Sequence, residues 1–174
     1  MKRRILFVCS GNCVRSQMAE AILKHLDPER FQAFSGGTCE TGFVHEMALA
    51  ALRSQNIPYG DLRSKSWKEF EGKRFDAVIV LCDDAAREAP PPGIGPAQPR
   101  SPLLLVHWSV NNPDAEIFFT EAEQQEAFNR VCRQLIGLLK HFSEAPDETL
   151  RDDEKFASLI REITQTHSES ESSS

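Results

Sequence analysis

Short apolar runs alternate along the chain with longer stretches in which apolar residues recur every three or four positions. The first run is followed by Met18, Ile22 and Leu26 at helical spacing, so a strand and a helix are predicted in succession. The alternation continues, and it predicts strands over 5–8, 31–34, 75–81 and 103–106 and helices over 15–26, 45–55, 68–70 and 121–142. The run 75–81 is apolar on both faces, which is typical of a strand at the centre of a parallel sheet.

The pattern changes after residue 145, where Ala145-Pro146-Asp147 marks the end of a first domain over residues 1–145. The remaining segment, 146–174, predicts a short amphipathic helix whose apolar face is formed by Phe156, Leu159, Ile160 and Ile163. This helix has two candidate uses, docking on the first domain or binding a partner. The run 167–174 is rich in Ser and Glu, which predicts disorder.

Composition narrows the class of protein. The 174 residues, 40% of them hydrophobic, suit one domain with a full core. A net charge of −6 without a basic patch argues against nucleic acid or an anionic membrane as a partner. The N-terminal apolar run is too short for a signal peptide, and no run approaches the ~20 residues of a membrane span. Five cysteines without framework spacing fit a reducing compartment, so we expect a cytoplasmic protein.

The loop between the first strand and the first helix carries the candidate chemistry. Cys9 closes the strand and Arg15 opens the helix, which is a Cys-x5-Arg spacing. Backbone N–H groups of a loop that enters a helix N-terminus converge on one centre, where the helix dipole also favours negative charge. The same donors and Arg15 would stabilise a thiolate at Cys9 and make it a nucleophile. The loop therefore predicts an oxyanion site formed by Ser10, Gly11, Asn12, Cys13, Val14, Arg15 and Ser16.

Individual side chains of this loop suit particular tasks. The planar guanidinium of Arg15 can hold two oxygens of a tetrahedral oxyanion. Gly11 and Asn12 are residue types that readily take positive φ, which a tightly curled loop requires. Ser16 can donate a hydrogen bond to the sulfur of Cys9 or of a leaving group.

Other interpretations of the loop are weaker. Cys9 taken alone is equally a small buried residue at the end of a strand. A Walker phosphate loop is excluded because the loop lacks Gly-Lys-Ser/Thr. A metal site is not expected, because no second Cys/His pair at ligand spacing accompanies Cys9 and Cys13.

The segment Val8-Cys-Ser-Gly-Asn-Cys-Val-Arg-Ser-Gln-Met-Ala-Glu20 resembles the active-site loop of the low-molecular-weight protein tyrosine phosphatase superfamily, which includes the thioredoxin-coupled arsenate reductases. Gln17, which follows Arg-Ser, is similar to the residue at that position in the arsenate reductase branch, whereas the phosphatases usually carry Pro there. Both branches usually place a second cysteine directly before the arginine, where this chain has Val14. The resemblance covers residues 4 to about 142. It implies a doubly wound, three-layer α/β/α fold with a four-stranded parallel sheet in flavodoxin-like order.

Cys82 follows the predicted central strand, and the carboxyl ends of parallel strands form the edge of a sheet where ligands bind. We therefore expect Cys82 to approach Cys9. The Pro-rich segment 83–102 that follows is predicted to be an irregular loop and a candidate lid. In the thioredoxin-coupled arsenate reductases that the segment resembles, this loop moves when disulfides form. Those enzymes have a third cysteine seven residues after the second, where this chain has Ala89, so the resemblance implies an incomplete disulfide relay.

Both branches of the superfamily place an Asp before the proline of the loop that follows the last strand, where it serves as general acid. The corresponding residue here is Asn112. A neutral amide cannot donate the proton that a leaving phenolate needs, and general acid catalysis is worth ~10²–10⁴-fold. Asp114, two residues on, is the candidate substitute.

Three hypotheses follow for the function. In the first, Cys9 attacks arsenate held by Arg15, and Cys82 then attacks Cys9 to release arsenite, with a thioredoxin, glutaredoxin, glutathione or mycothiol system as the external reductant. In the second, Cys9 takes a phosphoryl group from phosphotyrosine or another aryl phosphate, and water hydrolyses the thiophosphate. The third is a non-catalytic phosphate- or phosphoprotein-binding module, against which the intact Cys9 argues. Cys82 and Gln17 favour the first hypothesis and Ala89 weakens it. None of the three requires a bound cofactor.

Overall fold

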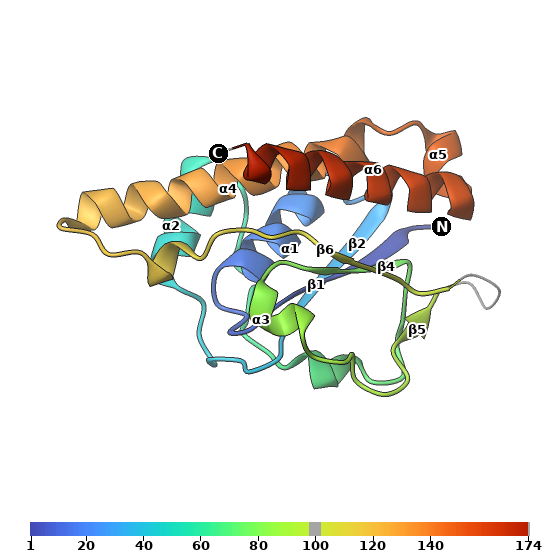
Figure 1. Ribbon diagram of the computed structural model, residues 1–174, viewed down its shortest axis with the longest axis horizontal. Coiled ribbons are helices and arrows are strands. Elements are labelled where there is room, and N and C mark those ends of the chain that lie inside the picture. Colours follow the sequence, from blue (N-terminus) through green and yellow to red (C-terminus); the bar gives the residue numbers. More distant parts are fainter. Residues whose placement is uncertain (98–101, 174) are drawn as a thin grey trace.

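The computed structural model describes residues 1–97 and 102–173, and it confirms the predicted α/β fold. The main sheet is parallel and has the strand order β2-β1-β4-β6, with β2 (Phe31–Gly37), β1 (Arg3–Cys9), β4 (Ala77–Val80) and β6 (Leu104–His107). Figure 1 shows one face of this sheet covered by the long helices, namely α1 (Arg15–Leu26), α2 (Glu46–Ser54) and α4 (Glu121–Glu144). These helices agree with the predicted ones.

The opposite face of the sheet is covered by shorter elements. They are η1 (Trp67–Phe70), α3 (Asp83–Ala86) and a two-stranded sheet of β3 (Arg74–Phe75) and β5 (Gly95–Pro96). Alternation along β1 explains why both faces are buried, because Ile5 and Phe7 join the core under the long helices, whereas Leu6 and Val8 join the core under the shorter elements. The sheet is therefore the middle of three layers.

Two sequence predictions need correction on this side of the sheet. The predicted strand 75–81 is divided at Asp76, whose carboxylate accepts a 2.7 Å hydrogen bond from the backbone N–H of Arg4. The two residues before Asp76 pair with β5 instead of joining the main sheet. The segment 83–102 was predicted to be irregular, but it begins as α3 and contains β5, while its residues 98–101 lie outside the described part.

The register of the strands gathers the predicted site residues at one edge. Cys9 is paired with Gly37 of β2, and Val8 is paired with Val80 of β4. The chain therefore leaves β1 and β4 at the same edge of the sheet. This is the carboxyl edge, at which open α/β sheets bind their ligands.

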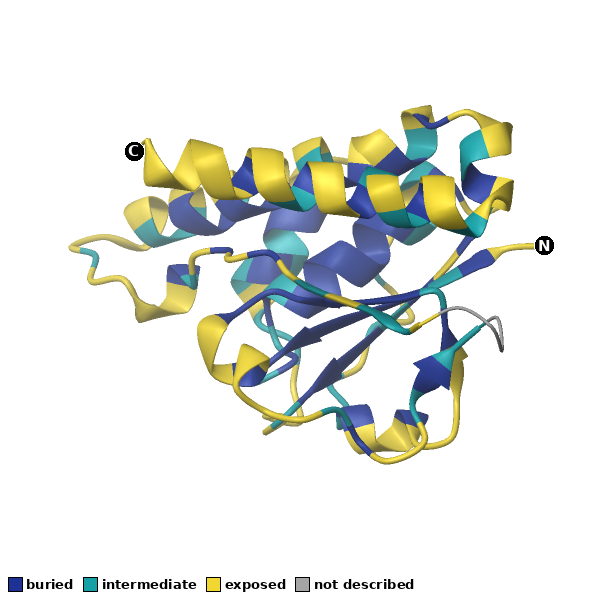
Figure 2. Cartoon of the chain, turned by 45° about the vertical axis from the view of Figure 1, so that its right-hand side comes forward, coloured by how far each residue is buried: buried dark blue, intermediate teal, exposed yellow. Residues whose placement is uncertain are grey.

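The C-terminal segment forms α5 (Asp147–Arg151) and α6 (Asp153–Ser172). Helix α6 continues through 167–172, so the prediction of a short helix and a disordered tail was wrong there; Ser174 lies outside the described residues. The helix extends because the apolar face formed by Phe156, Ile160 and Ile163 is followed at the same spacing by His167, which is 5% exposed. Figure 2 shows this buried face and the exposed outer face of α6.

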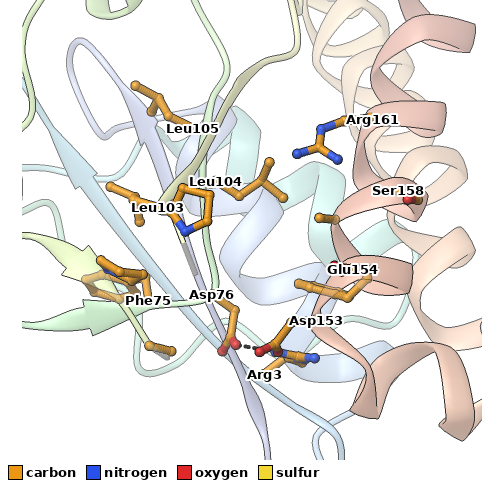
Figure 3. Close-up of a pocket in the computed structure, with 15 residues that line it drawn as sticks. Arg3, Phe75, Asp76, Leu103, Leu104, Leu105, Asp153, Glu154, Ser158 and Arg161 are labelled. Atoms are coloured by element: carbon orange, nitrogen blue, oxygen red, sulfur yellow. Dashed lines mark hydrogen bonds and ion pairs between the residues drawn. The ribbon is translucent and has the colours of Figure 1, made fainter. Parts of the chain in front are cut away.

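Of the two uses considered for this helix, the structure shows docking. Phe156, Ile160 and Ile163 belong to the same core as α1 and α4. Arg3 of β1 adds a polar anchor, because its Nη1 lies 2.7 Å from a carboxylate oxygen of Asp153 and 2.5 Å from one of Asp76 (Figure 3). Among the described helices, none has the length and apolar character needed to cross a membrane.

Candidate active site

Cys9 ends β1 and is 2% exposed, and the chain then curls through residues 10–14 into α1. The Sγ of Cys9 lies 2.9 Å from the Oγ of Ser16 in the first turn of that helix, which is the contact expected from the sequence. A hydroxyl can donate to a thiolate or accept from a thiol, so Ser16 can bond this sulfur in either protonation state. The sulfur is thereby fixed at the N-terminal end of α1.

The loop turns its carbonyl groups toward the segment that follows β2. The carbonyls of Cys9, Ser10, Gly11 and Cys13 accept hydrogen bonds of 2.9–3.2 Å from backbone N–H groups of Thr38, Cys39, Thr41 and His45, respectively. The N–H of a peptide points away from its carbonyl, so the N–H groups of the loop face the other way. Within the described chain, no backbone N–H of residues 11–17 donates a hydrogen bond. Such unpaired donors at a helix N-terminus form a binding site for an oxyanion.

Asn12 holds this curled shape from inside. It is fully buried and has a positive φ of 48°. A positive φ was expected from the sequence for both Asn12 and Gly11, but Gly11 is not among the residues that have one. Its Nδ2 donates to the hydroxyls of Ser16 and Ser35 at 2.8 and 3.0 Å. Its Oδ1 accepts from Gln17 Nε2 at 2.9 Å and from the backbone N–H of Lys65 at 2.8 Å. These four hydrogen bonds fix the Asn12 side chain inside the loop.

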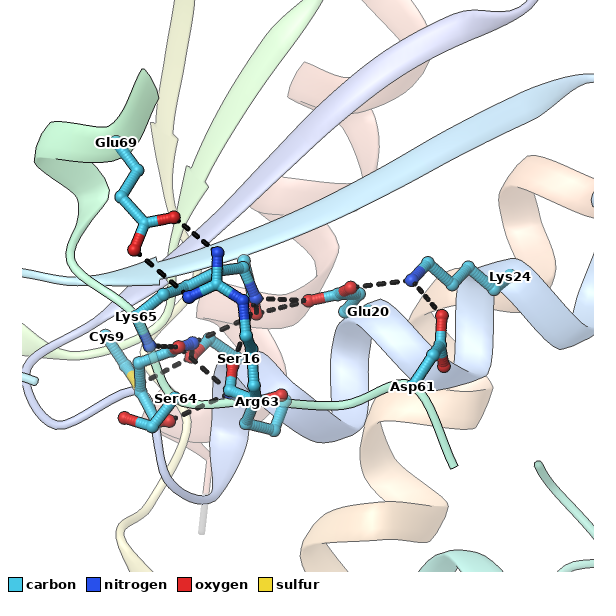
Figure 4. Close-up of polar contacts among 12 residues, drawn as sticks. Cys9, Ser16, Glu20, Lys24, Asp61, Arg63, Ser64, Lys65 and Glu69 are labelled. Carbon is cyan, nitrogen blue, oxygen red and sulfur yellow. Dashed lines mark hydrogen bonds and ion pairs between the residues drawn. The ribbon is translucent and has the colours of Figure 1, made fainter. Parts of the chain in front are cut away.

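A polar network around Glu20 (Figure 4) is joined to Asn12 through Ser35 and Lys65. Glu20 of α1 is 5% exposed, and its carboxylate accepts hydrogen bonds from the hydroxyl of Ser35, from Lys65 Nζ at 3.2 Å and from Lys24 Nζ at 2.7 Å. Burial disfavours the charged form of Lys24, but its hydrogen bonds to Glu20 and Asp61 raise the pKa of that ammonium. The network therefore keeps the buried carboxylate of Glu20 paired.

Sequence reasoning missed this network. Its one local signal is Glu20 on the face of α1 that also carries buried apolar residues, with Lys24 one turn later. Ser35 and Lys65 come from separate segments, so no spacing in the sequence connects them to Glu20.

Arg15 is fixed from the opposite side of the loop. Its Nη1 donates a 3.0 Å hydrogen bond to the carbonyl of Val110, which lies beyond β6 and is 3% exposed. A guanidinium carries five N–H donors, so this bond leaves others for an oxyanion. Arg15 is thus oriented by one bond and still able to bind a ligand bidentately.

Cys82 approaches the loop, as expected from its place after β4. Its Sγ lies 3.3 Å from the Oγ of Ser10, and it belongs to the same buried cluster as Cys9. The sulfur also accepts a 3.4 Å hydrogen bond from the backbone N–H of Ala85, which makes Cys82 the N-cap of α3. The second thiol therefore sits beside the oxyanion loop, on a helix of only four residues.

The other three cysteines differ in their surroundings, and all five are free thiols. Burial raises the pKa of the Cys13 thiol, an effect that a hydrogen bond with Thr41 opposes and the charge of Asp114 reinforces. Burial within the core also raises the pKa of Cys132, to about 11. Cys39 is exposed. Neither Cys13 nor Cys132 is thus favoured as a thiolate at neutral pH.

The candidate general-acid residues follow Val110. Asn112 is the N-cap of η2 (Pro113–Ala115), and its Oδ1 accepts a 3.3 Å hydrogen bond from the backbone N–H of Asp114. The carboxylate of Asp114 lies 3.4 Å from His45 Nε2. The negative charge of Asp114 also contributes to the raised pKa of Cys13 in the loop, after the larger effect of burial. Of the two residues, Asp114 is the one that can carry a proton.

The described part of the chain contains no cluster of three or more His, Cys, Asp or Glu side chains that would hold a metal ion. A cavity of about 780 Å³ lies between β6 and α6 (Figure 3), and no residue of the oxyanion loop lines it.

Comparison with known proteins gives one family. The model of the family "Low molecular weight phosphotyrosine protein phosphatase" matches residues 4–156. The chain is 33% identical to an arsenate reductase of Bacillus licheniformis over 146 residues, which are 82% of this chain and 96% of that protein. It is 30% identical to an arsenate reductase of Bacillus subtilis over 142 residues, which are 80% and 94% of the two chains.

Solved structures similar to this chain include an arsenate reductase and a tyrosine phosphatase. An arsenate reductase in the phosphate binding state is 25% identical and has a TM-score of 0.61, with 81% of this chain and 96% of that chain covered. The tyrosine phosphatase Wzb of Escherichia coli K30, solved with sulphate, is 19% identical and has a TM-score of 0.57, with 83% and 98% covered. The second likeness is one of fold alone.

Proposed function

The chain belongs to the low molecular weight phosphotyrosine protein phosphatase family, whose members are cysteine-dependent enzymes, and from this premise we propose that it is an arsenate reductase. The observation that carries the choice is the position of Cys82, whose Sγ lies 3.3 Å from Ser10 of the oxyanion loop and in one cluster with Cys9. A phosphatase needs one thiol, whereas reduction of arsenate by thiols consumes two. The arsenate reductases among the relatives support the same choice.

In the first step, Cys9 attacks the arsenic atom of arsenate held by the loop N–H groups and Arg15. An S–As bond forms, an As–O bond breaks, and the oxygen leaves as water after protonation. Ser16 is placed to hydrogen-bond the sulfur before and after the attack. Arg15 stabilises the charge that develops on the remaining oxygens.

In the second step, Cys82 attacks Cys9 Sγ. The S–S bond forms, the S–As bond breaks, and its electron pair stays on arsenic, which leaves as arsenite. Two thiols have then lost two electrons and arsenic has gained them. An external dithiol such as thioredoxin, or a low-molecular-weight thiol such as glutathione or mycothiol, returns two electrons to the Cys9–Cys82 disulfide.

The resolving step requires a small local rearrangement. Bonding to Cys9 removes Cys82 as the N-cap of α3, which has only four residues and few bonds to lose. Ala89 lies three residues after the end of α3, at the position where the resemblance implies a third thiol, so we propose that the external reductant attacks the Cys9–Cys82 disulfide directly.

Hydrolysis of aryl phosphates is the second candidate function. It is favoured by Asp114, a carboxylate that lies close to the loop and is able to protonate a leaving phenolate. The same Cys9 and Arg15 serve both reactions, so the two functions differ in their need for Cys82.

A paired assay separates the candidates. Purified protein is tested for arsenite release with thioredoxin, glutathione and mycothiol supplied in turn, and for hydrolysis of p-nitrophenyl phosphate. Cys9→Ser is expected to abolish both reactions, and Arg15→Ala to remove most of both. Cys82→Ser is expected to stop repeated arsenite release and to leave hydrolysis within about twofold of wild type.

Each outcome has a definite meaning. Repeated arsenite release by Cys82→Ser at the wild-type rate contradicts the resolving role. Hydrolysis without arsenite release under any reductant makes the chain a phosphatase. Binding of inorganic phosphate without either reaction makes it an oxyanion-binding module.

A further inference from the structure

Helix α6 makes two hydrogen bonds to the segment that leaves β6. The indole Nε1 of Trp108 donates to the Oγ1 of Thr164 at 2.8 Å. The Nε2 of His167 lies 2.6 Å from the carbonyl oxygen of Ser109, which can only accept, so this ring nitrogen carries the hydrogen. Trp108 is fully buried and His167 is 5% exposed, so each bond has one buried partner and is partly buried itself.

The same segment leads directly to the oxyanion loop. Val110 follows Ser109, and its carbonyl accepts the 3.0 Å hydrogen bond from Arg15 Nη1. The backbone N–H of Val110 donates to the carbonyl of Leu81 at 3.2 Å, immediately before Cys82. The segment is thus held by α6 on one side and by the end of β4 on the other, and it presents one carbonyl to Arg15.

These contacts of α6 lie outside the part of the chain that matches its family. The family model ends at residue 156, whereas Thr164 and His167 are further along α6. The arsenate reductase of Bacillus licheniformis is matched over 96% of its own length by 82% of this chain. The role of the extra helical turns must therefore be sought in this chain's own contacts.

We infer that Thr164 and His167 are positioning residues of the oxyanion site, acting through the 108–110 segment on Arg15. A flexible arginine loses side-chain conformational entropy when it binds an anion. A fixed acceptor that already bonds one of its N–H groups restricts the side chain before binding, so less entropy is lost when the anion binds. The bonds of Thr164 and His167 keep the acceptor fixed. The inference rests on the proposed function only in requiring that Arg15 binds an oxyanion.

The test measures binding of inorganic phosphate to the full chain by calorimetry, which does not depend on turnover. Thr164→Val combined with His167→Leu removes both bonds while keeping bulk in both sites. The dissociation constant of phosphate is expected to rise roughly three- to tenfold, the worth of about one hydrogen bond. Thr164→Ser with His167→Gln retains a hydroxyl and a side-chain N–H, and it is expected to restore affinity to within about twofold of wild type.

Ile160→Val is the matched control, because the Ile160 side chain is fully buried on the same face of α6 and takes part in no hydrogen bond; its carbonyl, which accepts from Thr164 Oγ1 at 2.7 Å, is kept in the variant. It is expected to lower stability and to leave phosphate affinity unchanged. Equal affinity losses in Ile160→Val and in the double variant would show general loosening of the helix and overturn the inference. Should the double variant not fold, Thr164→Val and His167→Leu are measured singly, and two folded single variants with wild-type affinity overturn it as well. A wild-type chain that binds no phosphate contradicts the proposed function itself.

Discussion

Asn112 and Asp114, the two candidate general-acid residues, have different surroundings in the structure. Asn112 caps η2 by accepting a hydrogen bond from the backbone N–H of Asp114, a task that needs only an oxygen acceptor. Asp114 supplies a carboxylate close to Cys13 and His45. The residue that caps η2 is therefore a neutral amide, and a carboxylate lies two positions later, beside His45.

The corresponding prediction concerns aryl phosphate hydrolysis. Asp114→Asn is expected to slow hydrolysis of an ester with a poor leaving group by about 10²-fold, and of p-nitrophenyl phosphate far less, because only the poor leaving group needs a proton. Asn112→Asp is expected to accelerate the poor substrate. Initial rates on the two esters check both variants, with Asp147→Asn in α5 as a control that changes neither rate. The same loss on both esters would exclude Asp114 as the proton donor.

At the scale of elements, the oxyanion loop owes its shape to the end of β2. A Cβ added to Gly37 would lie 2.6 Å from the carbonyl oxygen of Ser10 and 3.0 Å from the Cβ of Asn12. The strand thus approaches the loop so closely that only glycine fits. This contact, together with the hydrogen bonds from the segment after β2, forces the loop carbonyls to one side and the N–H groups to the other.

Gly37→Ala is therefore expected to push the loop away from β2. We expect a loss of about 1–3 kcal/mol in the free energy of unfolding, because the clash is with backbone atoms that cannot rotate away. Phosphate affinity is expected to fall at the same time. Gly60→Ala is the control, since a Cβ there meets no atom within 4 Å, and it should leave both quantities unchanged. Urea unfolding and phosphate titration measure them, and a Gly37→Ala variant with wild-type phosphate affinity would contradict this account of the loop.

At the scale of the whole molecule, α6 completes the core on the helical face of the sheet. Phe156 packs at centroid distances of 6.5 and 6.0 Å from Phe31 and Phe142, and the guanidinium of Arg3 lies 4.6 Å from its ring centroid. The first strand, the second strand and α4 thus all meet the C-terminal segment. A core shared in this way is expected to unfold as one unit.

Phe156→Ala is expected to lower the free energy of unfolding of the entire chain by about 3–5 kcal/mol, because it removes a buried ring from this shared core. The transition is expected to stay single when it is followed by far-UV circular dichroism and by tryptophan fluorescence. Glu162→Ala on the exposed face of α6 is the control and should change stability by less than about 0.5 kcal/mol. A first transition confined to α6, with the rest of the molecule unaffected, would show that the extension folds independently.

The sequence by itself determined the elements and the position of the chemistry. A short continuous apolar run identified β1 and the helical spacing identified α1 and α4, because these patterns depend on neighbours only a few positions apart. Cys9, Arg15 and the loop between them were found for the same reason, since seven consecutive residues carry the motif. The full length of α6 was not predicted, because the run 167–174 is rich in Ser and Glu, a composition typical of disorder. The burial of His167 on the inner face of the helix is seen only in the structure.

Only the tertiary structure decided what supports the site. The pairing of Glu20 with Ser35 and Lys65 joins three segments, and the bond from Arg15 to Val110 joins residues 95 positions apart. Such contacts depend on how the sheet twists and how the helices pack on it, which local propensity does not encode. The division of the predicted strand at Asp76 has the same origin, since the Asp76 carboxylate accepts hydrogen bonds from Arg3 and Arg4 of the neighbouring strand. Local sequence fixes which residues can do the chemistry, and packing over long separations in the chain fixes how rigidly they are held.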